Sequence, residues 1–293
     1  MTASSIDTST FAPRPGFAAR VKDYTRRNPT VVVGGGVLFL MALIAIFAPW
    51  IANDPMKLTP INRLKPPGEV YWFGTDFLGR EVFARTIYGS RVSLIVGGAV
   101  AAVSVTIGLA IGLVAGYVRW VDAIVMRIMD GIMAIPGVLF AIALISLAGA
   151  SLMNVIIAIT IPEIPRVVRL VRSVVLTIRE QPYVEAAISV GSPLPKILIK
   201  HILPNTFAPL IVQTTYVCAS AVVIEAILSF LGAGTPPEIP SWGNVMAEGR
   251  IYFQTAPWIL FFPGLLLAIT VLAVNILGDG LRDSLDPRIA RRM

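Results

Sequence analysis

Charged residues, cysteine and histidine are all scarce in this sequence. Only 14% of its 293 residues are charged and 56% are hydrophobic, whereas an ordinary soluble domain carries about 25% charged residues. Such a chain has too few charges to cover a soluble globule of this size. Cys218 is the only cysteine and His201 the only histidine, so the chain can form neither an intramolecular disulfide nor a multi-histidine metal site.

Two further absences concern nucleotides and secretion. No Gly-x-x-x-x-Gly-Lys-Ser/Thr loop occurs, so the usual cradle for nucleotide phosphates is missing. No cleavable secretory leader is recognised, because the first long apolar run begins at residue 31 and is too long for the core of such a leader. We therefore expect an uncleaved membrane anchor at the start of the chain, and no catalytic, cofactor-binding or metal-binding residues within it.

What the sequence has instead is long apolar runs. A helix needs ~20 mostly apolar residues to cross a bilayer, and residues 31–51, 92–118 and 131–162 contain no charge. Because the last run is too long for one helix and is interrupted at 149–151, we divide it into a hairpin. The predicted fold class is all-α, an integral membrane bundle of about six transmembrane helices. The expected spans are 31–51, 93–116, 131–149, 154–174, 206–231 and 257–278.

Charges inside two of these spans need an explanation, because a charge at membrane depth must face protein or water. The fourth span contains Glu163 and, at a spacing of three that places them on one helix face, Arg166, Arg169 and Arg172. The arginines favour the cytoplasmic end of the span. Glu163 and Glu225 could line a pore or accept structural hydrogen bonds between helices; for Glu225 we favour the structural role.

The basic residues predict the orientation of the chain. Most of the 24 Lys and Arg fall in residues 1–30, in the loop after the second span, in 166–201 and in 280–293. The positive-inside rule then predicts that both termini lie in the cytoplasm of a bacterial inner membrane, and an even number of spans agrees. The scatter of basic residues over these segments argues against a nucleic-acid partner.

The longest loop expected outside the membrane is 52–92. Its first half is rich in proline, and from Phe73 onward apolar residues alternate with charges. This pattern predicts an amphipathic helix lying at the membrane surface, which begins at a turn and cap formed by residues 74–76. A solvated loop without such a helix is the alternative.

The stretch 175–205, between the fourth and fifth spans, predicts two short cytoplasmic helices joined by a corner. The first covers about 180–190, and Gly191 can end it in the left-handed conformation. Ser192 can cap the second helix, with Pro193 at its first position. We expect this hairpin to project from the bilayer, either to contact a partner or as a surface feature without one.

Residues of this hairpin resemble the EAA motif of binding-protein-dependent ABC importer permeases. The matching positions are Glu185, Ala186, Ala187, Gly191, His201, Ile202, Leu203 and Pro204. The general motif has an aliphatic residue where this chain has His201. The dipeptide and oligopeptide branch of the family often has His-x-Leu-Pro-Asn there, which matches 201–205 in this chain.

Four more segments resemble the same branch in the same order: 73–80, 225–232, 240–243 and 275–288. Glu81 stands where aspartate is commoner in the family, and residues 162–166 depart from its pattern, which leaves the shape of the fourth span open. With these segments the resemblance covers roughly 30–290. It is to the C-type permease of dipeptide and oligopeptide systems, with a type I importer fold.

The resemblance implies a function and a set of partners. A chain of this family forms a translocation pore with a second permease, two cytoplasmic ATPase subunits bind ATP and Mg, and a periplasmic solute-binding protein delivers the solute. The implied divisions are a cytoplasmic tail 1–30, a first transmembrane helix 31–51, a periplasmic loop 52–92, a permease core 93–279 with coupling helices 180–203, and a cytoplasmic tail 280–293.

The resemblance also implies roles for single residues. The EAA positions Glu185, Ala186, Ala187, Gly191, His201, Leu203 and Pro204 would couple the chain to the ATPases. Asp76, Arg80 and Trp242 would contribute to docking of the binding protein. The solute would be a dipeptide or oligopeptide, or within the same branch a nickel chelate, glutathione or another small solute.

The alternative from another class is a self-sufficient secondary transporter or channel. Such a protein would couple through its own carboxylates, for which Glu163 and Glu225 are the candidates. No internal repeat of the kind common in secondary transporters is visible, and the expected cytoplasmic hairpin would have no purpose there. A membrane-embedded hydrolase is less favoured still, because the chain has one histidine and no nucleophile motif.

Overall fold

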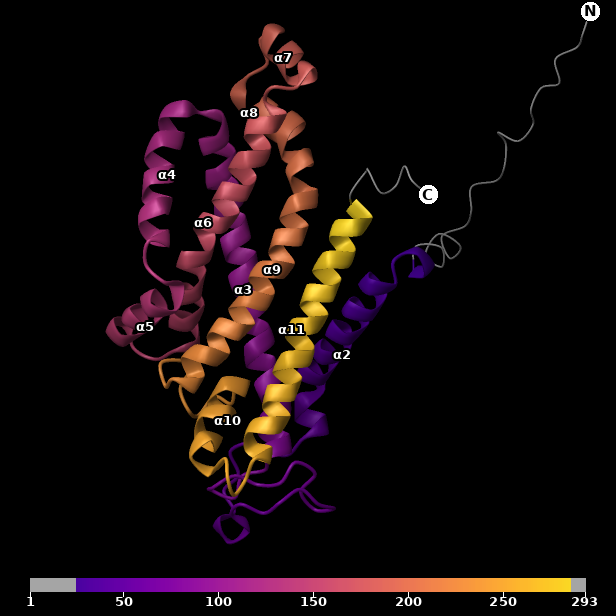
Figure 1. The fold of residues 1–293 in the computed structure, drawn as a ribbon, viewed down its shortest axis with the longest axis vertical. Helices are drawn as coiled ribbons and strands as arrows, with labels where there is room; N and C mark the ends of the chain where they lie inside the picture. Colours follow the sequence, from indigo (N-terminus) through magenta and orange to yellow (C-terminus); the bar gives the residue numbers. More distant parts are fainter. Residues whose placement is uncertain (1–24, 286–293) are drawn as a thin grey trace, which may run out of the picture.

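The structure is a computed structural model that describes residues 25–285. Over these residues it is a helical bundle without β-strands (Figure 1), so the predicted all-α membrane fold is confirmed. Most of the predicted tails 1–30 and 280–293 lies outside the described residues. The parts that are described, 25–30 and 280–285, are mostly helical and include the beginning of the first long helix and the end of the last.

Five long helices form the bundle: α2 (Pro29–Ile51), α3 (Val82–Tyr117), α6 (Leu152–Ile178), α9 (Leu203–Phe230) and α11 (Trp258–Leu285). Shorter elements connect them: η2 (Pro60–Asn62), α4 (Arg119–Met133), α5 (Gly137–Ala148), α7 (Pro182–Ser189), α8 (Leu194–Lys196), the π-helix η3 (Ile197–Ile202), α10 (Trp242–Gly249) and η4 (Arg250–Tyr252). We call the end that carries α7 and α8 the hairpin end, and the end that carries residues 52–81 and α10 the loop end (Figure 1).

Four helical segments of the described chain are long and apolar enough to cross a membrane, namely Pro29–Ile51, Val82–Tyr117, Leu194–Phe230 and Trp258–Leu285. The pair α4 and α5, bent by 84° at its break, gives a fifth if it is counted as one span. α6 is long enough with 27 residues, but Glu163 and its three arginines make it too polar for the same criterion. The expected number of six therefore depends on whether α6 crosses.

The third expected span, 131–149, is wrong as a single helix. The chain is helical from Arg119 to Met133, breaks, and resumes at Gly137. Pro136 lies in the break, and the residue before a proline is kept out of the helical conformation. The sequence interpretation placed the start of α4 in a loop because of its charges, but two of them, Asp122 and Asp130, form ion pairs with arginines of α6.

The expected surface helix at the end of loop 52–92 is also wrong. Residues 74–76 belong to a non-helical turn, and the helix begins only at Val82. It then continues without a break to Tyr117, so the segment before residue 93 is the first part of a 36-residue helix. Most of that first part is buried against the loop end of the molecule rather than lying along a membrane surface.

α3 packs most extensively against α6, and glycines allow the close approach. Gly108, Gly112 and Gly116 recur every four residues on α3, a spacing of small residues that is typical of contacts between membrane helices. A Cβ atom added to each would lie 2.6 or 2.7 Å from a valine Cβ of α6. The pairs are Gly108 with Val167, Gly112 with Val171, and Gly116 with Val175.

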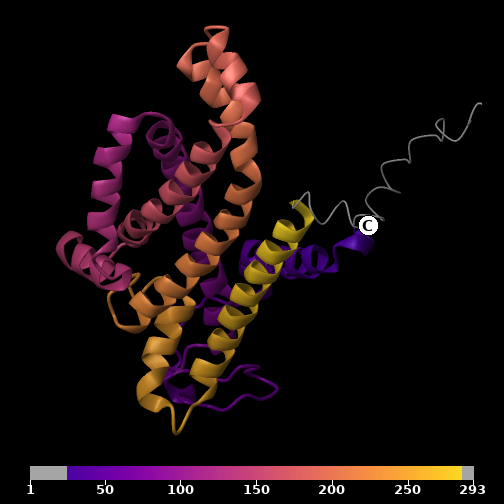
Figure 2. The ribbon, with the colours of Figure 1, turned by 45° about the horizontal axis from the view of Figure 1, so that its top comes forward.

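Different helices form the two sides of the bundle. α4 and α5 lie on one side, and α2 and α11 lie together on the opposite side (Figures 1 and 2). Gly34 of α2 meets the backbone of α11, because a Cβ there would lie 2.7 Å from the Leu277 nitrogen. Between the two sides, the largest apolar core joins α3, α6 and α9 and extends into the hairpin through Val184, Ile197 and Ile202.

Candidate functional site

The α7–α8 hairpin is the outermost feature of the hairpin end (Figure 1). α7 begins after Gln181 with Pro182 at its first position, where the missing N–H of proline costs no hydrogen bond. It ends at Gly191, which has φ +79°. The Gly191 N–H donates to the Ile188 carbonyl at 2.8 Å and the Ser192 N–H donates to the Ala187 carbonyl at 3.1 Å. This is a Schellman motif, and it agrees with the predicted corner at Gly191.

The start of the second helix differs from the prediction by one residue. Ser192 makes no capping bond, Pro193 is itself the cap residue, and the helix begins at Leu194. It is continued by the π-helical turn η3 and then by α9, with Pro204 in the first turn of α9 as expected. The hairpin is therefore joined to α9 by helical backbone rather than by a loop.

Buried apolar residues and one polar cluster attach the hairpin to the bundle. Val184, Ile197 and Ile202 are buried in the main core. Asn205 donates to the His201 carbonyl at 2.8 Å and to the Tyr183 hydroxyl at 3.2 Å. The predicted coupling residue His201 thus contributes its backbone to a contact that joins α7 to the beginning of α9.

The remaining surface of the hairpin is exposed and unusually apolar. Large side chains exposed there are Tyr183 (45%), Ile188 (47%), Val190 (85%), Leu194 (38%) and Ile199 (64%). Glu185 and Ala186 are exposed beside them, and Ala187 is half-buried. Within residues 25–285 the Glu185 carboxylate has no hydrogen bond or ion pair. A projecting helix with apolar side chains and an unpaired carboxylate is suited to contact another protein.

The other predicted coupling positions lie at the junction with α9. Leu203 is half-buried, and its carbonyl accepts a hydrogen bond from the Thr206 hydroxyl at 2.7 Å. Pro204 is exposed. The structure thus brings the coupling residues expected between 185 and 204 to one end of the molecule. They lie on α7, at the corner that follows it, and on the helical stretch from Leu194 into α9.

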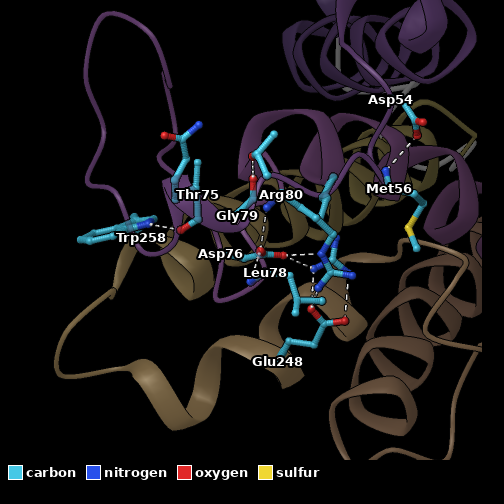
Figure 3. A network of polar contacts seen from close by, with 12 residues as sticks. Asp54, Met56, Thr75, Asp76, Leu78, Gly79, Arg80, Glu248 and Trp258 are labelled. Carbon is cyan, nitrogen blue, oxygen red and sulfur yellow. Dashed lines mark hydrogen bonds and ion pairs between the residues drawn. The ribbon is translucent and has the colours of Figure 1, made fainter.

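A second concentration of polar residues lies at the loop end (Figure 3). Asp76 accepts hydrogen bonds from the Leu78 and Arg80 N–H groups at 2.8 and 2.9 Å, and its other oxygen lies 2.6 Å from Arg80 Nε and 3.1 Å from Arg85. Glu248 of α10 pairs with both arginines, and its two oxygens lie 2.5 and 3.1 Å from the Arg85 guanidinium. Two carboxylates and two guanidinium groups thus join loop 52–81, the start of α3 and α10.

Three residues that were expected to dock a binding protein are buried at this end. The side chain of Asp76 is 0% exposed, that of Arg80 4%, and Trp242 is 0% exposed. The Trp242 indole donates to the Thr86 carbonyl at 3.0 Å, so its bonding partner lies within this chain. Their burial places these three side chains inside the loop end, where they hold neighbouring segments together, and their contribution to docking of a binding protein stays a prediction.

Arg85 and Glu248 belong to this network but are not predicted by the sequence. The alternation of apolar and charged residues after Phe73 predicts Arg85 on the polar face of a surface helix, and no sequence pattern singles out Glu248. The Arg85 side chain is fully buried and its Nε is without a partner among the described residues. The only available signal was an arginine among apolar residues directly before a long apolar run.

The two intramembrane carboxylates are both held by partners. Glu225 is fully buried and accepts hydrogen bonds from Ser229 on its own helix at 2.8 Å and from Ser93 of α3 at 3.2 Å. This is the interhelical role that the sequence favoured for it. Glu163 is 2% exposed, pairs with Arg166 at 2.9 Å and accepts a hydrogen bond from Ser220 of α9 at 3.2 Å.

The three arginines of α6 form one ion pair each. Arg166 pairs with Glu163 on the same helix, Arg169 lies 2.5 Å from Asp130 of α4, and Arg172 binds Asp122 through two nitrogens, one of them 2.6 Å away. The pairs follow one another along α6 at the spacing of three that the sequence showed. No group of three or more potential metal ligands occurs among the residues that the structure describes.

Comparison with known proteins agrees with this architecture. Residues 104–291 match the family described as "Binding-protein-dependent transport system inner membrane component", and residues 19–67 match the "N-terminal TM domain of oligopeptide transport permease C". The chain is 57% identical over 284 residues to a Sinorhizobium fredii protein named "Probable peptide ABC transporter permease protein y4tQ", with 95% of this chain and 98% of the relative covered.

Two other relatives are named for different solutes. The chain is 42% identical over 266 residues to the dipeptide transport system permease protein DppC of Alkalihalophilus pseudofirmus, with 90% of this chain and 88% of the relative covered. It is 40% identical over 271 residues to the glutathione transport system permease protein GsiD of Escherichia coli, with the same coverage. Similarity over almost the whole of each chain includes both the hairpin end and the loop end.

Proposed function

Because this chain belongs to the family of binding-protein-dependent transport system inner membrane components, with relatives of 40% to 57% identity along most of its length, we propose that it is the membrane subunit of an ATP-driven importer for dipeptides or oligopeptides. In this proposal it forms the translocation pore together with a second permease. Two cytoplasmic ATPases hydrolyse ATP, and a periplasmic binding protein delivers the solute.

The proposed topology has six crossings with both termini in the cytoplasm. Along the chain, α2, α3, the pair α4–α5, α6, α9 and α11 run alternately between the two ends of the bundle (Figure 1). The beginning of α2 and the end of α11 both lie toward the hairpin end (Figure 1), in agreement with the basic residues of the two tails. α6 takes its place among the crossings because its charges face protein partners, Asp122 and Asp130 of α4 among them.

The hairpin end is proposed to be the contact with an ATPase. The single observation that carries this proposal is the exposed surface of α7, where apolar side chains surround the unpaired Glu185. Ala186, which has no bulk beyond Cβ, allows a groove on the partner to approach the helix closely. The carboxylate of Glu185 can accept charge-assisted hydrogen bonds from a basic partner residue. The continuous backbone from η3 into α9 supports transmission of movement from this contact into the bundle.

The loop end is proposed to receive the binding protein, on residues other than those first expected. Large exposed side chains there include Ile61 (91%), Val70 (79%) and Trp72 (65%) of the loop and Ile251 (79%) and Phe253 (60%) after α10. These exposed apolar side chains are available to a partner, and the buried ion-pair network of Asp76, Arg80, Arg85 and Glu248 joins the loop to α10.

The solute class follows from the relatives. One is named for peptides, another for dipeptides and a third for glutathione, and we propose peptides for this chain. Glutathione, nickel chelates and other small solutes remain the outcomes that a solute screen with the cognate binding protein would distinguish.

The test is recovery of the complex through a tagged copy of this chain from gently solubilised membranes of its native host. We expect a second multi-span permease and P-loop ATPases to co-purify. Glu185→Arg should abolish co-purification of the ATPases with the tagged chain, or the stimulation of their ATP hydrolysis in the complex. The reason is that the new arginine places a like charge against the basic groove that the proposal requires. A chain that purifies alone and moves solute without ATP would contradict the proposal.

Glu69→Arg is the matched control for Glu185→Arg. It is the same charge reversal at another exposed glutamate, in the loop at the opposite end of the molecule. Recovery of the ATPases should be unchanged in this variant. If both reversals remove the ATPases equally, the effect is a general consequence of charge reversal and the contact is not at α7.

The alternative of a self-sufficient transporter rests on Glu163 and Glu225. Both carboxylates accept hydrogen bonds from this chain, which disfavours either as a free ion-coupling group. The family membership and the projecting apolar hairpin favour the importer.

A further inference from the structure

A cavity of about 250 Å³ lies where the break between α4 and α5 meets the proline-containing part of α6. Its wall includes Pro136, Gly137, Pro162, Glu163 and Arg166. On one side the chain turns by 84° between α4 and α5. On the other side α6 continues as a helix through Pro162, and a Cβ added to Gly137 would lie 3.4 Å from the Cβ of Pro162. The break and the first proline of α6 therefore lie side by side.

The prolines change the chemistry of this part of α6. Pro162 and Pro165 lie inside the helix and have no N–H, so the carbonyl groups one turn earlier, at Ala158 and Ile161, lose their helical donors. Transport proteins commonly bind their solutes where helices at membrane depth have free backbone groups. In α6 these two carbonyl groups lie within about one turn of the wall residue Pro162 along the helix.

The cavity also holds one carboxylate and one guanidinium. Glu163 is 2% exposed, while Arg166 is 46% exposed and its Nη1 lies 2.9 and 3.2 Å from the two carboxylate oxygens. At roughly 1.5 Å per residue, Glu163 is about 16 Å along α6 from Leu152, which is close to half of a ~30 Å hydrocarbon core. The pair therefore lies near the middle of the proposed membrane crossing.

The exposed side of the pair does not fit contact with lipid. Arg166 is 46% exposed and Arg169, one turn further along the same face, is 44% exposed. Charges at this depth face a protein partner or a water-filled path. The face of α6 that carries Arg166 is therefore on the side of the second permease and the path between the two subunits, and the cavity opens beside it.

We propose that Glu163 and Arg166 form a contact site for the solute during translocation, and that this site takes zwitterionic peptides with a free ammonium group and a free carboxylate. The inference rests on the proposed function. Without solute the two side chains neutralise one another. A zwitterionic peptide that enters the cavity replaces this internal pair, with its ammonium group on Glu163 and its carboxylate on Arg166, so neither charge is left uncompensated.

The experiment uses the complete complex, with both permeases, the ATPases and the cognate binding protein, reconstituted in liposomes. Import of a labelled dipeptide with free ends is measured per ATP hydrolysed. Arg166→Gln should lower this ratio about tenfold, the loss expected for one charge-assisted hydrogen bond, while assembly of the complex and stimulation of the ATPases by the loaded binding protein remain.

Arg169→Gln is the matched control. It is the same substitution on the same helix face, at a residue of similar exposure whose partner Asp130 is itself 61% exposed, and which does not belong to the cavity wall. Its import ratio should stay within about twofold of the unaltered complex, because exposed ion pairs contribute little. Equal losses in both variants would overturn the cavity as a specific site.

A charge exchange separates a solute contact from a structural ion pair. Glu163→Arg combined with Arg166→Glu keeps the pair but exchanges its ends. A structural role predicts that the exchanged pair restores import, and that result would overturn the proposal. A solute contact predicts that the complex still assembles while import stays low. If the unaltered complex imports no peptide, the proposed function itself has failed, which is a different result from equal import by all variants.

Discussion

Arg85 and Glu248 are 163 positions apart in the chain, yet the Arg85 guanidinium lies 2.5 and 3.1 Å from the two carboxylate oxygens of Glu248. The arginine is fully buried at the beginning of α3, and the glutamate is on α10. This relationship fixes the connection between α9 and α11 to the first turns of α3. It also explains why a buried arginine is tolerated beside the apolar residues of that helix.

Glu248→Ala should therefore destabilise the chain strongly. The substitution leaves Arg85 and Arg80 with Asp76 as the only carboxylate of the network, and an uncompensated buried charge costs about 3 kcal/mol or more. We expect a lowered unfolding temperature in detergent. Glu238→Ala, at an exposed glutamate in the same connection, should leave that temperature unchanged; a similar decrease in both would mean that the network contributes nothing specific.

Gly112→Ala should weaken the contact between α3 and α6. The new Cβ would lie 2.7 Å from the Val171 Cβ and 3.0 Å from the Val168 carbonyl oxygen, so one helix must move, at a cost of about 1–3 kcal/mol. The measurement is the yield and thermal stability of the purified chain. Val171→Ala in the same chain should recover only a small part of the loss, since it removes the Cγ1 atom at 3.0 Å but keeps the Cβ atom at 2.7 Å.

Gly98→Ala is the control for that prediction. Gly98 is on the same helix, and a Cβ there would meet nothing within 4 Å. Alanine is a better helix former than glycine by about 1 kcal/mol, so stability should be unchanged or slightly higher. A loss at Gly98 equal to that at Gly112 would show that backbone effects, not helix contact, explain both.

Gly191→Ala should loosen the hairpin. Gly191 has φ +79°, a conformation that costs a residue with a Cβ about 1–2 kcal/mol. Because a Cβ would meet nothing within 4 Å, the cost comes from the backbone alone. We expect faster amide hydrogen exchange at 191 and 192, and weaker stimulation of the ATPases in the complex. Gly149→Ala also places a Cβ at a positive φ, of +88° with ψ 158°, at a turn away from the hairpin, and should leave that stimulation intact.

Two substitutions at Glu225 test its structural role. Glu225→Gln keeps an oxygen that can accept from Ser93 or Ser229, so the folded complex should form and import should stay within about twofold. Glu225→Leu leaves both serine hydroxyls buried without their acceptor, which costs about 1–3 kcal/mol for each unsatisfied group, and thermal stability should fall. Abolition of import by Glu225→Gln in a stable complex would instead support a coupling role for the carboxylate.

The apolar pattern predicted most of the long helices well. The expected spans 31–51, 154–174, 206–231 and 257–278 correspond to α2, α6, α9 and α11 to within a few residues at most ends. These segments have long apolar sequence and clear boundaries. At the far end of α11 the helix continues to Leu285, beyond the expected end, since helical hydrogen bonding can extend past the apolar part of a span.

The errors arose where charges have partners far away in the sequence. Arg85 suggested a polar helix face because charged and apolar residues alternate around it, and its ion pairs with Asp76 and Glu248 are visible only in the folded chain. In the same way, the loop expected before residue 131 is helical as α4, whose Asp122 pairs with Arg172 of α6. The bend before Gly137 could have been anticipated from Pro136. The corner at Gly191 was predicted correctly, because left-handed helix ends depend on glycine itself and not on distant contacts.

The helix α9 connects two features that were described separately. From Pro209 to Phe230 it spans about 33 Å, and near its far end Ser229 interacts with Glu225 and with Ser241, the residue before α10. A tilt of roughly 5° imposed at the hairpin would displace that far end by about 3 Å over this length. α10 would move with this end of the helix, together with Arg80 and Arg85, which pair with Glu248 of α10. In the proposed complex, a movement imposed at the hairpin end would reach the loop end through α9, and the length of this one helix would determine how large the displacement at the loop end is.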